Sequence, residues 1–201
     1  MRKGLNLIQW CPGCGDFLIL GAIRKALQEL EIPKEDIVIV SGIGCSGKIS
    51  QYIDGYAAET LHGRSIPFAL GVKLANPKTH VICIGGDGDG YGIGLGHFLH
   101  ACRRNNPITY LVLDNENYAL TTGQASATTP LSVKTRTTTE GNTTAPFNPV
   151  ELARSAGCRF SREATDSNIT ELKELIKEAI LFDGFAHINI KQKCPSWKKW
   201  E

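Results

Sequence analysis

Four short segments that are apolar along most of their length constrain the fold of this chain most strongly. They cover residues 37–40, 80–84, 108–113 and 185–190. Such segments are typical of strands buried on both faces, as in a parallel sheet. Longer stretches with a helical spacing of apolar residues separate them. This alternation predicts an α/β fold, with a mainly parallel sheet that has helices on both faces.

The stretches between these segments predict five helices and one long loop. The helical stretches are residues 16–30, 65–74, 92–104 and 168–182, with a shorter one from Asn148-Pro149 to Ala156. Residues 121–147 are rich in threonine and show no periodicity, so we expect a loop that a ligand or partner orders. Because no internal repeat or linker is evident, residues 1–201 are predicted to form a single domain.

Composition and charge exclude several classes of protein. Apolar residues make up 42% of the chain and charged residues 21%, which excludes a disordered protein. The net charge is only +2 and the basic residues are scattered, which argues against nucleic-acid binding. No apolar run reaches the roughly 20 residues of a membrane span, and residues 1–10 do not resemble a signal peptide. We therefore expect a soluble, cytoplasmic protein.

Polar side chains follow two of the predicted strands at the point where each one ends. Asp87 stands between glycines just after residues 80–84, and Asp114-Asn115 follows residues 108–113. A right-handed crossover brings both turns to the carboxyl edge of the sheet, where α/β proteins bind ligands. Carboxylate and amide oxygens suit Mg²⁺, and glycines at a helix start let the backbone approach phosphates. The sequence therefore predicts a site for Mg²⁺ and a diphosphate.

A simple turn and a dinucleotide site are the alternatives for this segment. A lone Gly-Asp-Gly after a strand is more often only a turn, but the spacing to Asp114-Asn115 and the glycines up to Gly96 favour a ligand site. A Rossmann fingerprint needs an acidic residue about 20 positions later, at the end of the next strand. Here Asp87 and Asp89 both lie at the phosphate position, where they would repel a pyrophosphate that lacks a metal.

Seven cysteines in a chain expected in a reducing compartment indicate metal or redox chemistry rather than disulfides. Cys11 and Cys14 form one close pair, and no second close pair completes the usual pattern of structural zinc. Cys45 stands at a glycine-rich strand end, on the same predicted edge as Asp87. The residues alone leave an iron–sulfur cluster, a zinc site and unrelated thiols open. The remaining cysteines, expected to be core or incidental residues, are Cys83, Cys102 and Cys158.

With these residues in view, the sequence resembles a known family. Gly86-Asp87-Gly88, followed after 25 residues by Asp114-Asn115, resembles the thiamine diphosphate motif. Most of residues 10–130 is similar, in order, to the β subunit of the 2-oxoacid:ferredoxin oxidoreductases. The matching segments are CPGCG at 11–15, SGIGCSG at 41–47, LHGR at 61–64 and DNENYALTTGQ at 114–124. Beyond residue 130 the similarity rests on Pro146-Phe147-Asn148-Pro149 and Cys194-Pro195.

The resemblance implies a thiamine diphosphate-binding fold and a set of ligands. Asp87, the side chain of Asn115 and the main-chain carbonyl of Asn117 would bind Mg²⁺. The turns at 43–46 and 86–89 would lie against the diphosphate, together with His62. The implied cofactor contacts are Gly44, Cys45, Ser46, His62, Gly86, Asp87, Gly88, Asp89 and Asn117.

The resemblance also implies a redox enzyme made of more than one subunit. Cys11, Cys14, Cys45 and Cys194 would hold a [4Fe–4S] cluster, which accepts single electrons. The chain would be the β subunit of an enzyme that oxidatively decarboxylates a 2-oxoacid, pyruvate or 2-oxoglutarate, to CO₂ and acyl-CoA. Coenzyme A would take the acyl group and ferredoxin the electrons. An α-type subunit would carry the pyrimidine-binding domain and the activating glutamate, in a heterodimer that pairs again.

Two other functions stay open at this point. A non-redox thiamine diphosphate enzyme, a decarboxylase or a synthase, would keep Asp87 and Asn115 and would use the four cysteines for structural zinc. A non-catalytic, zinc-stabilised α/β module would not bind thiamine diphosphate at all. Metal analysis distinguishes these alternatives from the redox enzyme.

We make further predictions for three residues, Lys48, Ala119 and Thr122. Lys48 follows Cys45 closely and would meet a substrate carboxylate, or else be a solvated surface residue. Many members of the family carry glycine where Ala119 and Thr122 stand in this chain. We therefore expect the backbone to avoid left-handed geometry at both of these positions.

Overall fold

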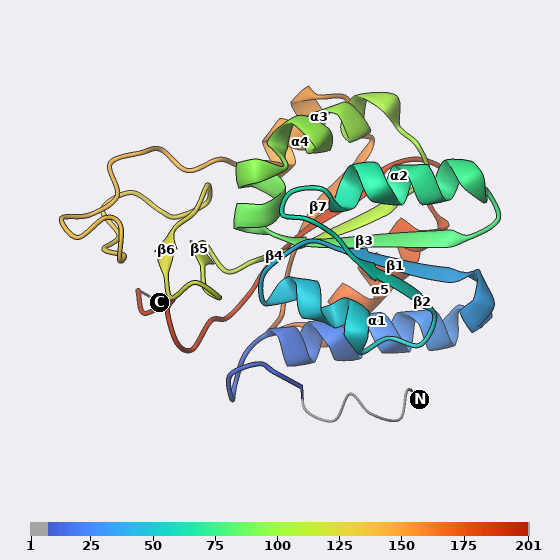
Figure 1. Ribbon diagram of the computed structural model, residues 1–201, viewed down its shortest axis with the longest axis horizontal. Helices are drawn as coiled ribbons and strands as arrows, with labels where there is room; N and C mark the ends of the chain where they lie inside the picture. The colour runs from blue at the N-terminus through green and yellow to red at the C-terminus, as the bar shows by residue number, and fades with distance from the viewer. Residues whose placement is uncertain (1–7, 201) are drawn as a thin grey trace.

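The computed structural model describes residues 8–200, which contain a six-stranded sheet (Figure 1). The strands are β1 (Ile37–Ser41), β2 (Tyr56–Glu59), β3 (His80–Gly86), β4 (Thr109–Asp114), β7 (Phe160–Thr165) and β8 (Ala186–Lys191). Their order in the sheet is β2-β1-β3-β4-β8-β7, and every neighbouring pair is parallel. The structure confirms the predicted parallel α/β architecture.

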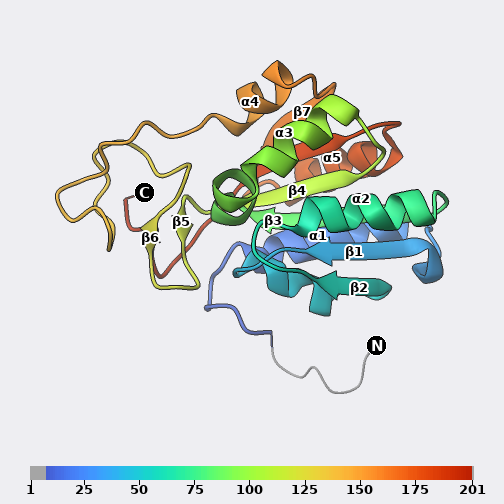
Figure 2. The same cartoon turned by 45° about the horizontal axis from the view of Figure 1, so that its top comes forward.

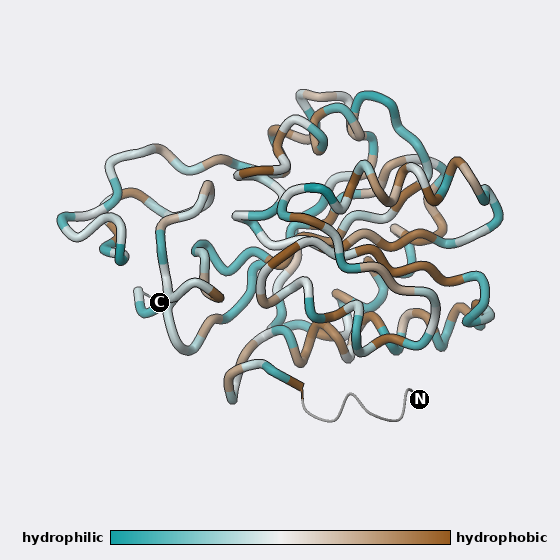
Figure 3. The backbone as a smooth tube through the Cα atoms, in the orientation of Figure 1, coloured by the Kyte–Doolittle hydropathy of each residue, from teal (hydrophilic) through white to brown (hydrophobic). Residues whose placement is uncertain are grey.

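Helices cover both faces of the sheet, as expected. They are α1 (Asp16–Glu29), α2 (Ser65–Ala75), α3 (Leu95–Arg104), α4 (Pro149–Ser155) and α5 (Ile169–Leu181). Helices α1 and α5 cover one face, and α2, α3 and α4 cover the other (Figures 1 and 2). Successive residues of β1 point to opposite faces: Ile37 and Ile39 pack beneath α1, whereas Val38 and Val40 pack on the α2 side. Figure 3 shows the apolar segments concentrated in these strands and in the helix faces against them.

The sequence pattern does not predict the two strands at the edges of the sheet, β2 and β7. Strand β2 is only four residues long, and Tyr56 and Glu59 at its ends are exposed. Strand β7 carries the exposed residues Arg162 and Glu163. An edge strand has one neighbour and carries polar side chains, so it lacks the continuous apolar character of the central strands.

The segment around the predicted site has more local structure than the sequence indicates. Helix α3 covers most of the predicted 92–104, but it begins at Leu95, and residues 92 and 93 belong to a preceding π-helix, η3 (Gly88–Ile93). The segment 121–147 contains no helix, as expected. A short strand just before it, β5 (Asn117–Tyr118), pairs antiparallel with one inside it, β6 (Gln124–Ala125). In Figure 2, the arrows of β1, β2 and β3 point toward the side of the molecule that carries β5 and β6.

Among the described helices, none combines the length and the apolar composition that crossing a membrane requires. The prediction that the N-terminus is not a signal peptide concerns mainly residues 1–7, which lie outside the described residues.

Candidate functional site

The loops that follow β1, β3 and β4 meet at the carboxyl edge of the sheet and enclose a small pocket. Its lining includes all nine residues implied as cofactor contacts, together with Asn115. The volume is about 90 Å³, well below the roughly 300–1,000 Å³ of a typical small-molecule site. The structure thus brings the predicted set together but forms only part of a cofactor-sized cavity.

Glycines let the loops after β3 and β4 pack directly on each other. A Cβ atom on Gly88 would lie 2.2 Å from the ring of Tyr118, so no larger residue fits there without movement. The Tyr118 hydroxyl donates to the Gly88 carbonyl at 3.2 Å. A Cβ on Gly86 would lie 3.2 Å from the Ser46 hydroxyl of the loop after β1. The three loops are therefore held in contact around the pocket.

The carboxylate of Asp87 is buried without a charge partner. It is 1% exposed, and the Thr128 hydroxyl lies 3.2 Å from its Oδ2 atom. Burial, and after it the nearby Asp114 carboxylate, raise the pKa of Asp87 to about 8. No ion pair reaches Asp87 from any described residue. A bound cation would compensate this charge, so the donor fits the predicted Mg²⁺ site.

The two asparagines after β4 also fit a cation site. Asn115 and Asn117 both line the pocket. Asn115 Oδ1 accepts the main-chain N–H of Asn117 at 3.1 Å and keeps a free lone pair. The buried Oδ1 atom of Asn117 has no hydrogen-bond donor within residues 8–200. Asp114, by contrast, is directed inward, where the Lys191 ammonium lies 2.8 Å from its Oδ2 atom.

Asp89 accepts hydrogen bonds that hold the loops around the pocket together. Its Oδ1 atom accepts the main-chain N–H groups of Ile43, at 3.1 Å, and Gly63, at 2.8 Å. His62 Nδ1 lies 2.9 Å from the same oxygen. Burial raises the pKa of Asp89, and these three contacts lower it in part. The implied contact residue Asp89 therefore lines the pocket while it ties two other loops together.

The N-terminal and C-terminal segments, which carry three of the four implied cysteines, lie side by side. The C-terminal segment returns to the N-terminal one, where the Gln192 amide donates to the Cys14 thiol at 3.4 Å. The Ser196 hydroxyl donates to the Cys11 thiol at 3.2 Å. Cys194 lies between these two residues in the sequence, so the fold brings it to the close pair.

Cys45 connects the cysteines with the pocket, because it lines the pocket as well. Burial, and after it the Asp16 carboxylate, raise the pKa of the Cys45 thiol to about 11. Lys48 opposes this shift, and the thiols of Cys194 and Cys11 add to it. Cys45 thus links the lining of the pocket with the region of Cys11 and Cys194.

The spacing of this group differs from that of a site for one metal ion. Across residues 8–200, no three His, Cys, Asp or Glu side chains come close enough together to ligate a single ion. Four thiolates around one zinc ion, each at about 2.3 Å, would be separated by about 3.8 Å. A cubane cluster binds each thiolate at a different iron and needs wider spacing. The described side chains therefore do not form a site for a single metal ion.

Comparisons with known proteins agree with this geometry. Residues 42–190 match the family of the thiamine pyrophosphate enzyme C-terminal TPP binding domain. The 2-oxoacid:ferredoxin oxidoreductase subunit beta of Saccharolobus solfataricus is 48% identical over 94% of this chain. The 2-oxoglutarate synthase subunit KorB of Archaeoglobus fulgidus is 39% identical, and the match covers 94% of this chain and 71% of that subunit. The chain belongs to the β-subunit family of the 2-oxoacid:ferredoxin oxidoreductases.

Solved structures give the same result for the fold. A 2-oxoglutarate:ferredoxin oxidoreductase from Magnetococcus marinus superimposes with a TM-score of 0.95 at 39% identity, over 96% of this chain and 67% of the other. A thiamine diphosphate-dependent 4-hydroxybenzoylformate decarboxylase from Rhodococcus jostii shares the fold at a TM-score of 0.60 and 19% identity, over 88% of this chain and 32% of its own. The chain spans 62% of the length of the S. solfataricus β subunit.

The Lys48 side chain lies beside the N-terminal segment that carries Cys11 and Cys14. Its Nζ atom lies 3.4 Å from the main-chain carbonyl of Gln9, and its charge lowers the pKa of Asp16 and Cys45. Lys48 is absent from the pocket lining. A contact with a substrate carboxylate stays a prediction.

One expectation about the loop after β4 is wrong. Thr122 has φ +81°, in the left-handed region that was expected to be avoided, whereas Ala119 does not. The Thr122 hydroxyl accepts from the Arg136 guanidinium, whose Cζ lies 5.9 Å from the centroid of the Trp197 ring. Contacts from a distant part of the chain hold Thr122 in a conformation that glycine adopts without strain.

The sequence reasoning missed two buried or strained acidic residues near the site. Asp16 accepts from the Cys14 thiol at 3.3 Å, and burial raises its pKa to about 7. Glu116 has φ +61° between the two asparagines, and its carboxylate is held by Lys191 at 3.1 Å and Lys198 at 3.4 Å. Asp16 follows the cysteine pair directly, but nothing in the local sequence around Glu116 indicates its contacts.

The remaining cysteines lie apart from this group, as expected. Cys83, Cys102 and Cys158 are buried in the core on the α2, α3 and α4 side.

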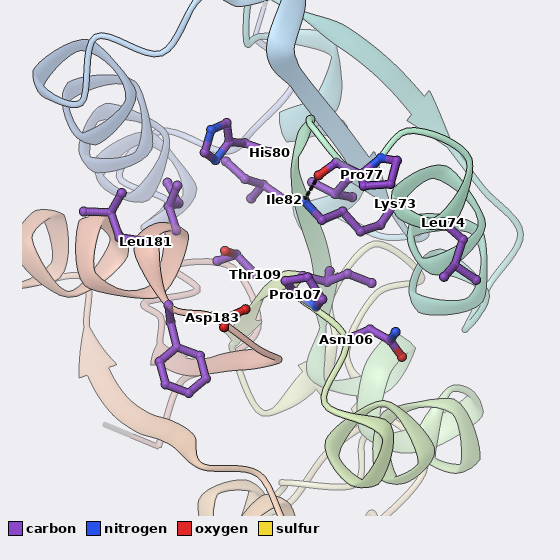
Figure 4. A pocket seen from close by; sticks show the side chains of 14 residues that line it. Lys73, Leu74, Pro77, His80, Ile82, Asn106, Pro107, Thr109, Leu181 and Asp183 are labelled. Carbon is purple, nitrogen blue, oxygen red and sulfur yellow. Dashed lines mark hydrogen bonds between the residues drawn. The ribbon is translucent and has the colours of Figure 1, made fainter.

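A roomier cavity, of about 450 Å³, lies at the opposite edge of the sheet and contains none of the predicted site residues (Figure 4). Its Lys73 ammonium already donates to the carbonyls of Pro77, at 2.8 Å, and Thr79, at 2.7 Å. The residues implied as cofactor contacts therefore line the smaller pocket and not this cavity.

Proposed function

We propose that this chain is the β subunit of a 2-oxoacid:ferredoxin oxidoreductase and holds the diphosphate end of thiamine diphosphate. The enzyme would decarboxylate pyruvate or 2-oxoglutarate oxidatively to CO₂ and acyl-CoA, with ferredoxin as the electron acceptor. One observation carries the proposal: Cys45 belongs both to the Asp87 pocket and to the group of four cysteines. A cofactor and an electron acceptor on these two sets of residues would therefore be adjacent.

The residues of the pocket fit Mg²⁺ and a diphosphate. Asp87, Asn115 Oδ1 and the carbonyl of Asn117 would hold the metal, which compensates the buried charge of Asp87. The main-chain N–H groups of the glycine-rich turns at 43–46 and 86–89 would donate hydrogen bonds to the phosphate oxygens. His62, 33% exposed at the side chain and held against Asp89, would face the same groups.

The four cysteines fit a [4Fe–4S] cluster. When bound, thiamine diphosphate supplies the electron sink for decarboxylation and the cluster supplies single-electron acceptance. The chain's own contribution is to exclude water from Cys14 and Cys194, both buried, and to keep Cys45 between the two groups. Burial raises the pKa of Cys45 to about 11, so its thiol would have to lose a proton to serve as a cluster ligand.

A partner subunit is part of this proposal. The pocket holds about 90 Å³, which is far less than a whole cofactor needs, so a second chain would complete it. That α-type subunit would supply the pyrimidine side of the site and the activating glutamate, and the pair would dimerise again. The solved M. marinus oxidoreductase contains 2-oxoglutarate, coenzyme A and succinyl-CoA, which supports the same substrate class here.

Metal analysis of protein purified without oxygen tests the proposal. We expect about four iron and four sulfide per chain, and almost none in a Cys45→Ser variant. Cys102→Ala, which removes a buried thiol outside the group, is the matched control and is expected to keep its iron. One zinc and no sulfide would overturn the redox proposal and favour a non-redox thiamine diphosphate enzyme with structural zinc.

A further inference from the structure

A row of buried polar side chains crosses the apolar core beneath the Asp87 pocket. Each member is at most 1% exposed. In order, the members are Ser161, His187, Tyr91, Asn189 and Asp114, and we call them the Tyr91 chain. Polar groups so deep in a core cost stability unless every one of them is paired. Each member of the Tyr91 chain therefore needs a hydrogen-bond partner inside the core.

Four short contacts link the members. Ser161 Oγ lies 2.9 Å from His187 Nδ1, and His187 Nε2 lies 2.7 Å from the Tyr91 hydroxyl. The Tyr91 hydroxyl lies 2.8 Å from Asn189 Oδ1, and Asn189 Nδ2 lies 3.1 Å from Asp114 Oδ2. The chain runs from β7 through β8 and the π-helix to the end of β4.

The acidic end determines which atom donates at the two links nearest to it, Asn189–Asp114 and Tyr91–Asn189. Asp114 Oδ2 accepts from both the Lys191 ammonium, at 2.8 Å, and the Asn189 amide, at 3.1 Å. Asn189 must then turn its Nδ2 group toward Asp114, which leaves its Oδ1 atom facing Tyr91. Because Oδ1 can only accept, the Tyr91 hydroxyl must donate to it.

The remaining two links follow from this assignment. The Tyr91 hydroxyl has given its only proton to Asn189, so it must accept from His187 Nε2. His187 is neutral, since burial lowers its pKa to about 3, and its Nδ1 atom therefore accepts from Ser161. Every donor in the Tyr91 chain points toward Asp114. Only this one arrangement satisfies all of its members.

Two connections join the Tyr91 chain to Asp87. The Thr128 hydroxyl lies between the two carboxylates, 2.7 Å from Asp114 Oδ1 and 3.2 Å from Asp87 Oδ2. Tyr91 also belongs to the π-helix Gly88–Ile93, which begins directly after Asp87. The π-helix is a rare conformation that needs support from its surroundings. The Tyr91 ring supplies such support, with its centroid 5.3 Å from that of Phe98.

We propose that the Tyr91 chain is a positioning device that holds Asp87 in the orientation for binding the divalent cation. It acts from one side through Asp114 and Thr128, and from the other through the π-helix. The inference rests on the proposed function, because it assumes that Asp87 is a cation ligand. Tyr91 is a positioning residue here and touches no reacting atom.

A pair of tyrosines tests the proposal. Tyr91 and Tyr110 are both completely buried and both lie against Phe98. The Tyr110 hydroxyl, however, has no hydrogen-bond partner in the described part of the chain. Tyr91→Phe and Tyr110→Phe therefore remove the same atom from the same core, but only the first breaks the Tyr91 chain.

The measurement is the affinity for Mn²⁺ in the presence of thiamine diphosphate, made on the protein purified in the complex in which it occurs. Loss of the paramagnetic resonance signal of free Mn²⁺ reports binding without any need for turnover. Tyr91→Phe removes both hydrogen bonds of the Tyr91 hydroxyl, and we expect it to weaken Mn²⁺ binding about tenfold. Tyr110→Phe is expected to bind like the wild type.

The outcomes separate this inference from the proposed function. A wild type that does not bind Mn²⁺ with thiamine diphosphate contradicts the proposed function. A wild type that binds, with Tyr91→Phe binding equally well, overturns the positioning role even if Tyr91→Phe melts at a lower temperature. If Tyr91→Phe does not fold, Ser161→Ala takes its place. This variant must weaken Mn²⁺ binding in the same direction by a smaller factor, and unchanged affinity overturns the inference.

Discussion

At the scale of single residues, the site depends on two aspartates in opposite electrostatic settings. Asp114 is paired with Lys191 at 2.8 Å and accepts from Asn189 and Thr128. Its charge is compensated inside the protein. Asp87, equally buried, has no ion pair with any residue in 8–200, and its pKa is raised to about 8. A cation bound as proposed would compensate its charge.

We expect metal-free wild type to lose stability relative to Asp87→Asn as the pH rises from about 4 to about 8. The folded pKa of Asp87, about 8, lies above the ordinary 3.8, so the fold prefers the neutral form, which is lost over this range. The change is on the order of a few kcal/mol. Urea unfolding in EDTA at several pH values measures it.

Asp114→Asn is the control for this experiment. It leaves the Lys191 ammonium without its closest carboxylate, so it is expected to destabilise the chain at neutral pH. A difference between wild type and Asp87→Asn that does not change with pH would contradict the assignment of Asp87 as an uncompensated buried carboxylate.

At the scale of elements, the π-helix and the loop after β4 determine the shape of the pocket. The π-helix begins immediately after Asp87, and its first residue, Gly88, packs directly under the ring of Tyr118. The φ of Gly88 is not in the left-handed region. Space, and not backbone conformation, therefore requires glycine at this position.

Gly88→Ala is expected to destabilise the chain by about 1–3 kcal/mol and to weaken binding of thiamine diphosphate with Mg²⁺. The added methyl group would lie 2.2 Å from the Tyr118 ring and would push the loop after β4 away from Asp87. Gly96→Ala in α3 is the matched control, because nothing lies within 4 Å of its added Cβ. Alanine there should stabilise the helix by about 0.5–1 kcal/mol. Urea unfolding and calorimetric titration of both variants measure these effects, and similar results for the two would refute this packing argument.

At the scale of the whole molecule, the pocket borders a long segment with little regular structure. Residues 121–147 extend beyond the sheet on the side of β5 and β6 (Figures 1 and 2). Leu131 and Phe147 in this segment are 54% and 41% exposed. Together with the small pocket, these exposed apolar side chains support a partner subunit on this side.

Limited proteolysis tests this placement. Lys134 is exposed in the segment, so trypsin is expected to cut the isolated chain there first. In the complex with the α-type subunit, cleavage after Lys134 should slow at least about tenfold, whereas cleavage after the exposed Lys25 of α1, on the far side of the sheet, should be unchanged. Equal cleavage after Lys134 in both forms would place the interface elsewhere.

Much of the fold follows from local sequence. The central strands β1, β3, β4 and β8 are apolar along most of their length, and the helices between them have regular apolar spacing, so both are predicted closely. The edge strands β2 and β7 are not, since each has a single neighbour and polar positions. The π-helix is also not predicted, because its glycine-rich segment has no preferred conformation of its own.

Some properties of the site can likewise be predicted from the sequence, whereas others depend on the tertiary structure. The carboxylate, amides and glycines of the pocket stand in short motifs beside strand ends, so the sequence by itself determined which residues meet and which chemistry they suit. Tertiary structure alone decided that Asp114 is paired inward with Lys191 while Asp87 remains uncompensated. It also decided the left-handed conformation of Thr122 and the direction of the Tyr91 chain. These properties depend on contacts between residues up to 98 positions apart, and the charge, strain and donor direction they set exist only once the chain has folded.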